Sequence, residues 1–271
     1  MNKTLGLIAG NGAFPILLAQ EAKKSGDRVI VAALKEEADT IVEKHADQIT
    51  WLSIGQLGHI ISFFKDHQVT HAVMAGQVKH TQLFKNIIPD LRATKILAKT
   101  VNKKAASILS LVIQEFEEDG IQFLSSTTYL EHWLCPEGIL TKRRLSPEQE
   151  ADIAFGVPLA RAIAAQDIGQ TIVVKDKSVI AVEAMEGTDA CIRRAGDIAG
   201  PGCIVIKVAR PRQDPRFDVP VVGLRTIQAV TQSGARVLAL EAGKTLLLDK
   251  DALIKEADAS QLTLTGLQVQ G

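Results

Sequence analysis

The stretch of residues 210–220 brings carboxylates and arginines together between prolines. It reads RPRQDPRFDVP and contains Asp214, Asp218, Arg210, Arg212 and Arg216. Carboxylate oxygens are suitable ligands for Mg²⁺ or Mn²⁺, which commonly bind one or two carboxylates together with substrate phosphates. Arginine supplies forked N–H donors that match phosphate oxygens. These residue types together indicate a metal-assisted reaction at a phosphoryl group.

The backbone decides whether the two aspartates can act together. In an extended chain Asp214 and Asp218 would lie roughly 13 Å apart, too far to share one cation. Residues 214–217, Asp-Pro-Arg-Phe, are a favourable β-turn sequence, with Asp first and Pro second. We expect this turn to bring both carboxylates to one side, with the acids of residues 183–189 nearby. The alternative is a surface loop whose Arg and Asp side chains pair only with each other, at about 0–1 kcal/mol per pair.

A glycine loop near the N-terminus could contact an anion. Gly10, Asn11 and Gly12 follow an apolar run and precede a helical pattern, where a dinucleotide-binding fingerprint would lie. Pro15 replaces the third glycine of that fingerprint, and no convincing acidic residue ends the second strand. Backbone N–H groups and the helix N-terminus can still face a phosphate. The alternative is a tight turn in which glycine only satisfies the backbone conformation.

The elements that position these residues alternate in type through the first half. Apolar, β-branched runs predict strands, and amphipathic stretches between them predict helices. The strands are 5–9, 28–34, 49–53, 71–75 and 120–124, and the helices are 15–24, 56–67, 93–100 and 104–118. This alternation is typical of a parallel sheet covered by helices on both faces.

The second half is again α/β but richer in strands. Residues 135–147 have the composition of a linker, so we place the boundary between two domains, 1–135 and 136–271, near residue 135. Ser146 then opens a helix, with Pro147 in its first turn and Gln149 completing a capping box. Further strands are 171–175, 179–183, 203–208, 236–240, 245–248 and 262–264, and helices begin near 188, 224 and 249. The first two of these strands should pair around Asp176 and Lys177.

Composition excludes several classes of protein. The 271 residues include 31 Lys+Arg and 31 Asp+Glu, whereas a nucleic-acid-binding protein normally shows a basic excess. Three scattered cysteines indicate a reducing compartment, and Cys135, followed by proline and without a nearby histidine, is not an expected nucleophile. No window reaches the roughly 18 apolar residues of a membrane span, and the apolar N-terminal run is too short for a signal peptide. We therefore expect a soluble, cytoplasmic protein.

Four motifs in order resemble one family. They are IAGNGAFP at 8–15, AGQVK at 75–79, EAMEGTD at 183–189 and QDPRFDVPVVG at 213–223. The combination is similar to the LpxI family, the UDP-2,3-diacylglucosamine pyrophosphatases of lipid A biosynthesis. The likeness spans nearly the whole chain. It implies a Mg²⁺-dependent (or Mn²⁺-dependent) hydrolase that releases UMP and 2,3-diacylglucosamine 1-phosphate, with an N-terminal Rossmann-like domain, a C-terminal α/β domain and substrate held between them.

The resemblance, added to the residue chemistry, gives a set of expected site residues. The family's essential acid falls on Asp214 or Asp218, of which we rank Asp214 first. The expected catalytic residues are Asp214, Asp218 and Arg216. The expected substrate contacts are Gly10, Asn11, Gly12, Lys79, Thr188 and Arg212. The expected metal ligands are Asp214, Asp218, Glu186 and Asp189.

The expected substrate is a lipid-linked sugar nucleotide. We expect a homodimer, no nucleic-acid partner, and peripheral contact with the cytoplasmic face of the inner membrane. Two other classes remain open: a nucleotide- or NAD(P)-binding oxidoreductase, and a non-catalytic module that binds UDP-sugars without hydrolysis.

Overall fold

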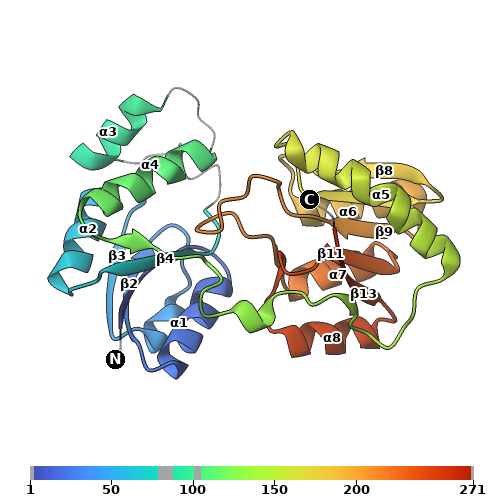
Figure 1. Cartoon of the computed structure of the whole chain (residues 1–271), viewed down its shortest axis with the longest axis horizontal. Coiled ribbons are helices and arrows are strands. Elements are labelled where there is room, and N and C mark those ends of the chain that lie inside the picture. The colour runs from blue at the N-terminus through green and yellow to red at the C-terminus, as the bar shows by residue number, and fades with distance from the viewer. Residues whose placement is uncertain (1–2, 79–87, 101–104, 270–271) are drawn as a thin grey trace. The chain divides into compact units, whose positions relative to one another are not determined.

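The chain forms two compact units, shown in Figure 1. The computed structural model describes residues 3–78, 88–100 and 105–269. Unit 1 comprises Met1–Leu130 together with Pro215–Asp218, and unit 2 comprises Glu131–Asp214 and Val219–Gly271. The acidic stretch is therefore divided, since Asp214 belongs to unit 2 and Asp218 to unit 1. Both units are α/β, as the sequence predicts.

Unit 1 is built on a parallel sheet of five strands in the described part of the chain. The strands are β1 (Thr4–Ala9), β2 (Arg28–Leu34), β3 (Gln48–Leu52), β4 (His71–Ala75) and β5 (Gln122–Phe123). Their order is β3-β2-β1-β4-β5, and every neighbouring pair is parallel. This Rossmann-like order confirms the predicted parallel sheet. The strand order reverses between β1 and β4, and in open α/β sheets ligands bind outside the carboxyl ends of the strands at such a point.

Helices pack against this sheet through apolar faces. They are α1 (Phe14–Lys24), α2 (Leu57–Asp66) and α4 (Ala105–Glu118). α3 (Leu91–Lys99) packs on α2 and α4, and Thr40–His45 forms a 3₁₀ turn. Pro15 lies in the first turn of α1, where a missing N–H removes no helical hydrogen bond. Phe64 of α2 and Phe116 of α4 are fully buried in one core cluster, and the Phe116 ring meets Phe123 edge-on at 5.1 Å.

Unit 2 contains a mixed sheet of six strands within the described residues, in the order β6-β13-β11-β9-β7-β8. The strands are β6 (Gly138–Ile139), β7 (Thr171–Lys175), β8 (Ser178–Val182), β9 (Ile204–Lys207), β11 (Val237–Glu241) and β13 (Thr263–Leu267). β9, β11 and β13 are parallel, whereas β6 and β7 run antiparallel to their neighbours. β10 (Val221–Val222) and β12 (Leu246–Leu247) form a separate parallel pair. The predicted strand-rich α/β unit is confirmed.

Helices cover both faces of this sheet (Figure 1). α5 (Pro147–Ala165) packs on one face, against the cluster that contains Ile172 and Ile206. α6 (Thr188–Ala199), α7 (Leu224–Gln232) and α8 (Lys250–Ala259) contribute to the cluster on the other face. The predicted capping box opens α5, because Ser146 accepts from the Gln149 N–H and the Gln149 side chain accepts from the Ser146 N–H. The predicted pairing of β7 with β8 is also observed.

Two details differ from the sequence-based expectations. Residues 135–147, which have the composition of a linker, are instead bound to unit 2. Gly138–Ile139 forms β6, the Leu140 N–H donates to Leu264 O at 2.8 Å, and Cys135 is buried. Proline and glycine are also compatible with a short edge strand, so composition alone was misleading here. The predicted strand 245–248 exists as β12, but it pairs with β10, which the sequence did not reveal.

In the described part of the chain, no helix has both the length and the apolar character that crossing a membrane requires.

Candidate functional site

Two loops cross closely at the carboxyl ends of β1 and β4. The Gly10 N–H donates to Ala75 O at 2.8 Å, and Asn11 and Gln77 exchange backbone hydrogen bonds of 2.8 and 3.0 Å. A Cβ atom on Gly10 would lie 2.7 Å from Gln77 O, and one on Gly76 would lie 2.7 Å from Asn11 O. Such distances are too short for any larger residue. The glycines are therefore required by this close approach of two backbones.

This crossing limits how the glycine loop could hold a phosphate. The N–H groups of Gly10 and Asn11 already donate to carbonyls, and the Asn11 side chain donates to Glu37 O at 3.1 Å. In the first turn of α1, Pro15 has no N–H and the Leu17 N–H donates to Ala13 O, so helix geometry leaves the Phe14 and Ile16 N–H groups as the donors that an anion could use. Gly12, exposed and with φ +98°, leads into that turn. The substrate contacts at 10–12 remain predictions, and Lys79 lies outside the described residues.

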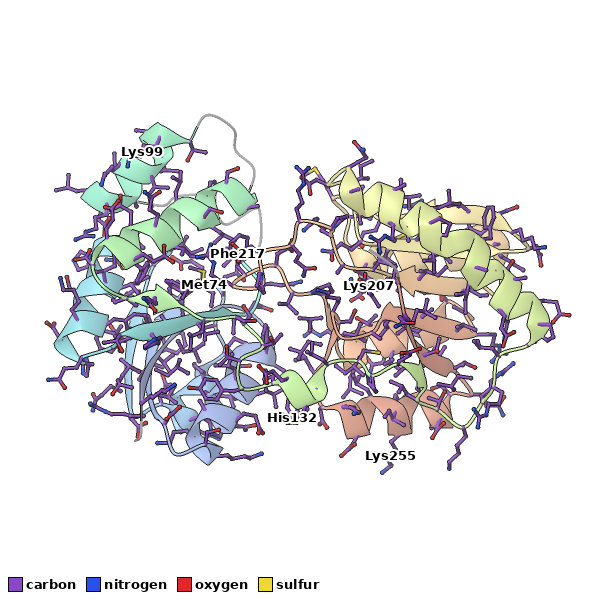
Figure 2. All side chains as sticks on the ribbon, viewed as in Figure 1. Met74, Lys99, His132, Lys207, Phe217 and Lys255 are labelled. Carbon is purple, nitrogen blue, oxygen red and sulfur yellow. The ribbon has the colours of Figure 1, made fainter. Side chains whose placement is uncertain are left out.

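The acidic stretch turns at residues 215–217, within the predicted turn 214–217, and these residues belong to unit 1. The Ser126 N–H donates to Pro215 O at 2.8 Å, and the Ser126 hydroxyl lies 2.7 Å from Arg216 O and 2.9 Å from Met74 O. Phe217 packs against the same core cluster as Met74. Figure 2 labels both residues. The turn therefore lies next to the end of β4 and the segment that follows β5.

The charged residues of this stretch differ in their surroundings. The Arg216 guanidinium binds Glu117 of α4 at 3.0 Å, so this expected catalytic arginine has a carboxylate partner in unit 1. Arg212 lies in an exposed turn of unit 2. Asp214 and Asp218 are half-buried and flank the turn on either side.

A buried polar cluster lies at the carboxyl ends of β8 and β9 in unit 2. Lys207, the last residue of β9, donates from Nζ to Thr188 Oγ1 at 2.8 Å. Thr188, the first residue of α6, donates its hydroxyl hydrogen to Glu183 Oε1 at 2.7 Å. Glu183 directly follows β8, and its other oxygen accepts from the Gln170 N–H at 3.1 Å. We call Glu183, Thr188 and Lys207 the Lys207 cluster; Figure 2 labels Lys207.

Burial and charge act against each other in this cluster. Burial lowers the pKa of Lys207, while the charges of Glu183 and Asp189 oppose that effect. Burial raises the pKa of Glu183. The charge of Lys207 and hydrogen bonds from Thr188, Thr171 and the Gln170 N–H outweigh burial, and the pKa of Glu183 therefore lies below its ordinary value. Because the Thr188 hydrogen is directed to Glu183, Thr188 retains only acceptor capacity toward a substrate.

The start of the acidic stretch is held by two other carboxylates of unit 2. The Ala209 N–H donates to Glu241 Oε2 at 2.8 Å, and Glu241 is buried at the end of β11. Arg210 lies 3.5 Å from a carboxylate oxygen of Asp167. The backbone leading toward Asp214 is therefore fixed where it leaves β9.

Two of the four expected metal ligands, Glu186 and Asp189, have polar partners within unit 2. Glu186 binds Arg194 at 2.6 Å and accepts from the Ala184 N–H, while Asp189 lies 3.5 Å from the Thr226 hydroxyl. Among the described residues, no group of three or more His, Cys, Asp or Glu side chains forms a candidate metal site. Carboxylate oxygens such as those of Asp214 and Asp218, both half-buried, are of the donor type that Mg²⁺ takes, one or two at a time together with phosphate and water. The metal contacts remain predictions.

Sequence reasoning missed Lys207 and Glu241. Each is the only charged residue in an otherwise apolar strand, IVIK in β9 and VLALE in β11. A single charge in a buried strand is costly unless it is paired, so this pattern could have identified both. The expectation about Cys135 agrees with its environment, because burial raises the pKa of this thiol to about 11.

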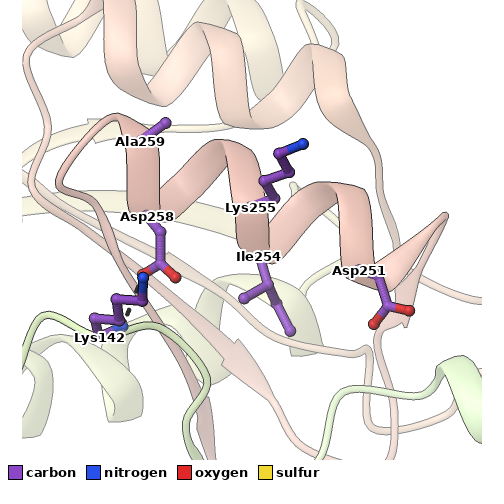
Figure 3. Close-up of a pocket in the computed structure, with 6 residues that line it drawn as sticks. All are labelled: Lys142, Asp251, Ile254, Lys255, Asp258 and Ala259. Atoms are coloured by element: carbon purple, nitrogen blue, oxygen red, sulfur yellow. Dashed lines mark hydrogen bonds between the residues drawn. The ribbon is translucent and has the colours of Figure 1, made fainter.

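A surface pocket of about 470 Å³ lies elsewhere on unit 2, along α8 (Figure 3). Its lining includes Lys142, whose backbone N–H donates to Asp258 at 2.7 Å. None of the expected site residues is among those that line it.

Fold and site together define a two-unit α/β protein with a Rossmann-like sheet, a glycine-loop crossing and an acidic, arginine-containing turn. The sequence profile of the LpxI N-terminal domain matches residues 4–133, and that of the LpxI C-terminal domain matches residues 136–265. The chain is also 33% identical, over 99% of both sequences, to a Caulobacter vibrioides protein named UDP-2,3-diacylglucosamine pyrophosphatase LpxI. The chain belongs to the LpxI family.

Solved structures show only a distant likeness. The biotin carboxylase domain of Hydrogenobacter thermophilus 2-oxoglutarate carboxylase has a TM-score of 0.30 at 13% identity, covering 73% of this chain and 41% of that one. The biotin carboxylase subunit of a pyruvate carboxylase has a TM-score of 0.29 at 13% identity, covering 74% and 43%. A likeness of this extent supports no argument.

Proposed function

We propose that this protein hydrolyses the pyrophosphate of UDP-2,3-diacylglucosamine to UMP and 2,3-diacylglucosamine 1-phosphate in lipid A biosynthesis. The principal support is the 33% identity, over 99% of each sequence, to a protein of that name. The acidic turn with its arginines adds chemistry suited to a phosphoanhydride. In the reaction, a water oxygen bonds to one phosphorus and the bridging P–O bond breaks, which leaves two phosphate monoesters.

Each group near the turn has a proposed task. Asp214 and Asp218 would hold Mg²⁺ or Mn²⁺, with Glu186 and Asp189 as further candidates. Such a cation, when bound, supplies charge neutralisation and a more acidic water. Arg212 binds phosphate oxygens, and Arg216, which Glu117 orients, neutralises charge on the leaving phosphate. The first turn of α1, beyond Gly12, binds phosphate through its N–H groups.

UMP release tests this proposal directly. The purified chain is incubated with UDP-2,3-diacylglucosamine and Mg²⁺, with and without EDTA, and UMP is quantified. We expect release that EDTA abolishes. Asp214→Asn should remove it, as should Asp218→Asn, whereas Asp251→Asn, at an exposed position on α8, serves as the matched control. Absence of UMP from the wild-type chain would refute the function, and near-wild-type turnover by both site variants would refute the assignment of the aspartates.

The assembly and location follow as separate proposals. We propose a cytoplasmic homodimer that contacts the inner membrane only peripherally, because its proposed substrate carries two acyl chains. Light scattering during size-exclusion chromatography tests the dimer. Flotation with vesicles of anionic phospholipid, at low and high salt, tests the membrane contact.

A further inference from the structure

The hydrogen bonds of the Lys207 cluster have a fixed direction. A lysine ammonium can only donate, so Thr188 Oγ1 must accept from Lys207. The single hydroxyl hydrogen of Thr188 is then directed to Glu183, 2.7 Å away. Lys207 is only 7% exposed. Because a buried polar group that loses its hydrogen-bond partner is costly, the contacts of Lys207 and Glu183 with Thr188 hold this arrangement in place.

The cluster joins three separate segments at the carboxyl end of β9, where the chain continues into the acidic stretch. Glu183 follows β8, Thr188 begins α6, and Lys207 ends β9. The residues after Lys207 lead directly through Ala209, which Glu241 holds, toward Asp214. The Lys207 side chain thus links the first turn of α6 to the segment that leads to the acidic turn.

We propose that Lys207 is a positioning residue for the hydrolysis proposed above: acting through Thr188, it holds the first turn of α6 in fixed register with the start of the acidic stretch. This inference rests on the proposed function. Lys207 itself does not need to touch the substrate. Its effect should therefore appear mainly in kcat, with little change in KM.

The same sheet offers a matched control lysine. Lys175 ends β7, and its Nζ donates to Ala199 O at 2.7 Å and to Pro201 O at 3.0 Å. It thereby binds the carboxyl end of α6, whereas Lys207 binds the amino end. Because β7 runs antiparallel to its neighbour β9, the last residues of the two strands, Lys175 and Lys207, lie at opposite ends of this strand pair. Lys175→Met therefore also removes a strand-end lysine that contacts α6, but at a position remote from the acidic stretch.

The test compares steady-state kinetics and thermal unfolding of full-length variants. We expect Lys207→Met to lower kcat about 10–100-fold, the usual effect of losing a residue that orients a functional group. Thr188→Val should lower kcat similarly, and Thr188→Ser, which keeps the hydroxyl, should lower it less. The double variant of Lys207→Met and Thr188→Val should be no slower than the slower single variant, because both remove one interaction. Lys175→Met should lower the melting temperature without lowering kcat.

The possible results separate the two proposals. A wild-type chain that releases no UMP would overturn the proposed function and this inference with it. If the wild type is active but Lys207→Met and Lys175→Met have the same kcat, the inference alone is overturned. It is also overturned if the fold-decreases in kcat of Lys207→Met and Thr188→Val multiply in the double variant. If Lys207→Met does not fold, the comparison of Thr188→Val with Thr188→Ser decides, and equal kcat values for these two would also overturn it.

Discussion

Replacement of Ser126 by alanine should release the acidic turn from unit 1. The Ser126 hydroxyl has one hydrogen and lies between two carbonyl oxygens, Arg216 O and Met74 O, in a position that is only 2% exposed. Losing the hydrogen bond costs about 0.5–1.5 kcal/mol, and a buried carbonyl left without a donor costs about 1–3 kcal/mol. The backbone bond from the Ser126 N–H to Pro215 O survives the substitution. We therefore expect the Ser126→Ala substitution to lower the free energy of unfolding by about 1–3 kcal/mol.

Urea unfolding and UMP release measure the two consequences. Each 1.4 kcal/mol corresponds to about a tenfold change in an equilibrium constant, so kcat should fall severalfold if the bound turn is the active form. Ser110→Ala is the control, because Ser110 donates only to Ala106 O within α4 at an exposed site. An unfolding free energy within about 0.5 kcal/mol of wild type, together with unchanged kcat, would show that Ser126 does not hold the turn.

Three further predictions concern other parts of the molecule. Gly10→Ala should destabilise unit 1 by about 1–3 kcal/mol in urea unfolding, because its Cβ would meet backbone across the loop crossing. Hydrogen bonds from Lys65 and then Arg92 lower the pKa of Asp119. The stability that this lowered pKa contributes is present above the ordinary aspartate pKa of about 3.9 and is lost as the pH falls through the lower pKa of the folded protein. In Asp119→Asn, the free energy of unfolding should therefore fall less steeply as the pH is lowered through this range. All three cysteines are buried free thiols, with the pKa of Cys135 raised to about 11, and should react with Ellman's reagent only after unfolding.

Local sequence signals were sufficient to predict most of the helices and strands. The runs 28–34, 71–75 and 171–175 are the strands β2, β4 and β7 without a shift at either end, because each is a short β-branched or apolar run between polar or glycine-containing turns. The turn predicted over residues 214–217 is also observed, with residues 215–217 assigned as turn, since Pro215 fixes the backbone at its second position. Backbone chemistry within a few residues determines features of this kind.

Features that depend on distant partners were not predictable in the same way. Strands of two residues such as β6 and β10 have no periodicity to detect, and their existence depends on β13 and β12. The sequence also could not show that Asp214 and Asp218 belong to different compact units. The direction of the hydrogen bonds around Lys207 follows only from the meeting of three segments, although the charge within β9 was visible in the sequence.

The acidic stretch is fixed in two places by residues that share no partner. The Lys207 cluster and Glu241 hold its start in unit 2, while Ser126 binds its turn in unit 1. Substitutions at independent sites usually add within about 0.3–0.5 kcal/mol. The double variant of Ser126→Ala and Lys207→Met should therefore lose the sum of the two single losses in unfolding free energy. A coupling well above 0.5 kcal/mol would show that the two attachments form one cooperative element, and the separate roles argued for them would then be wrong.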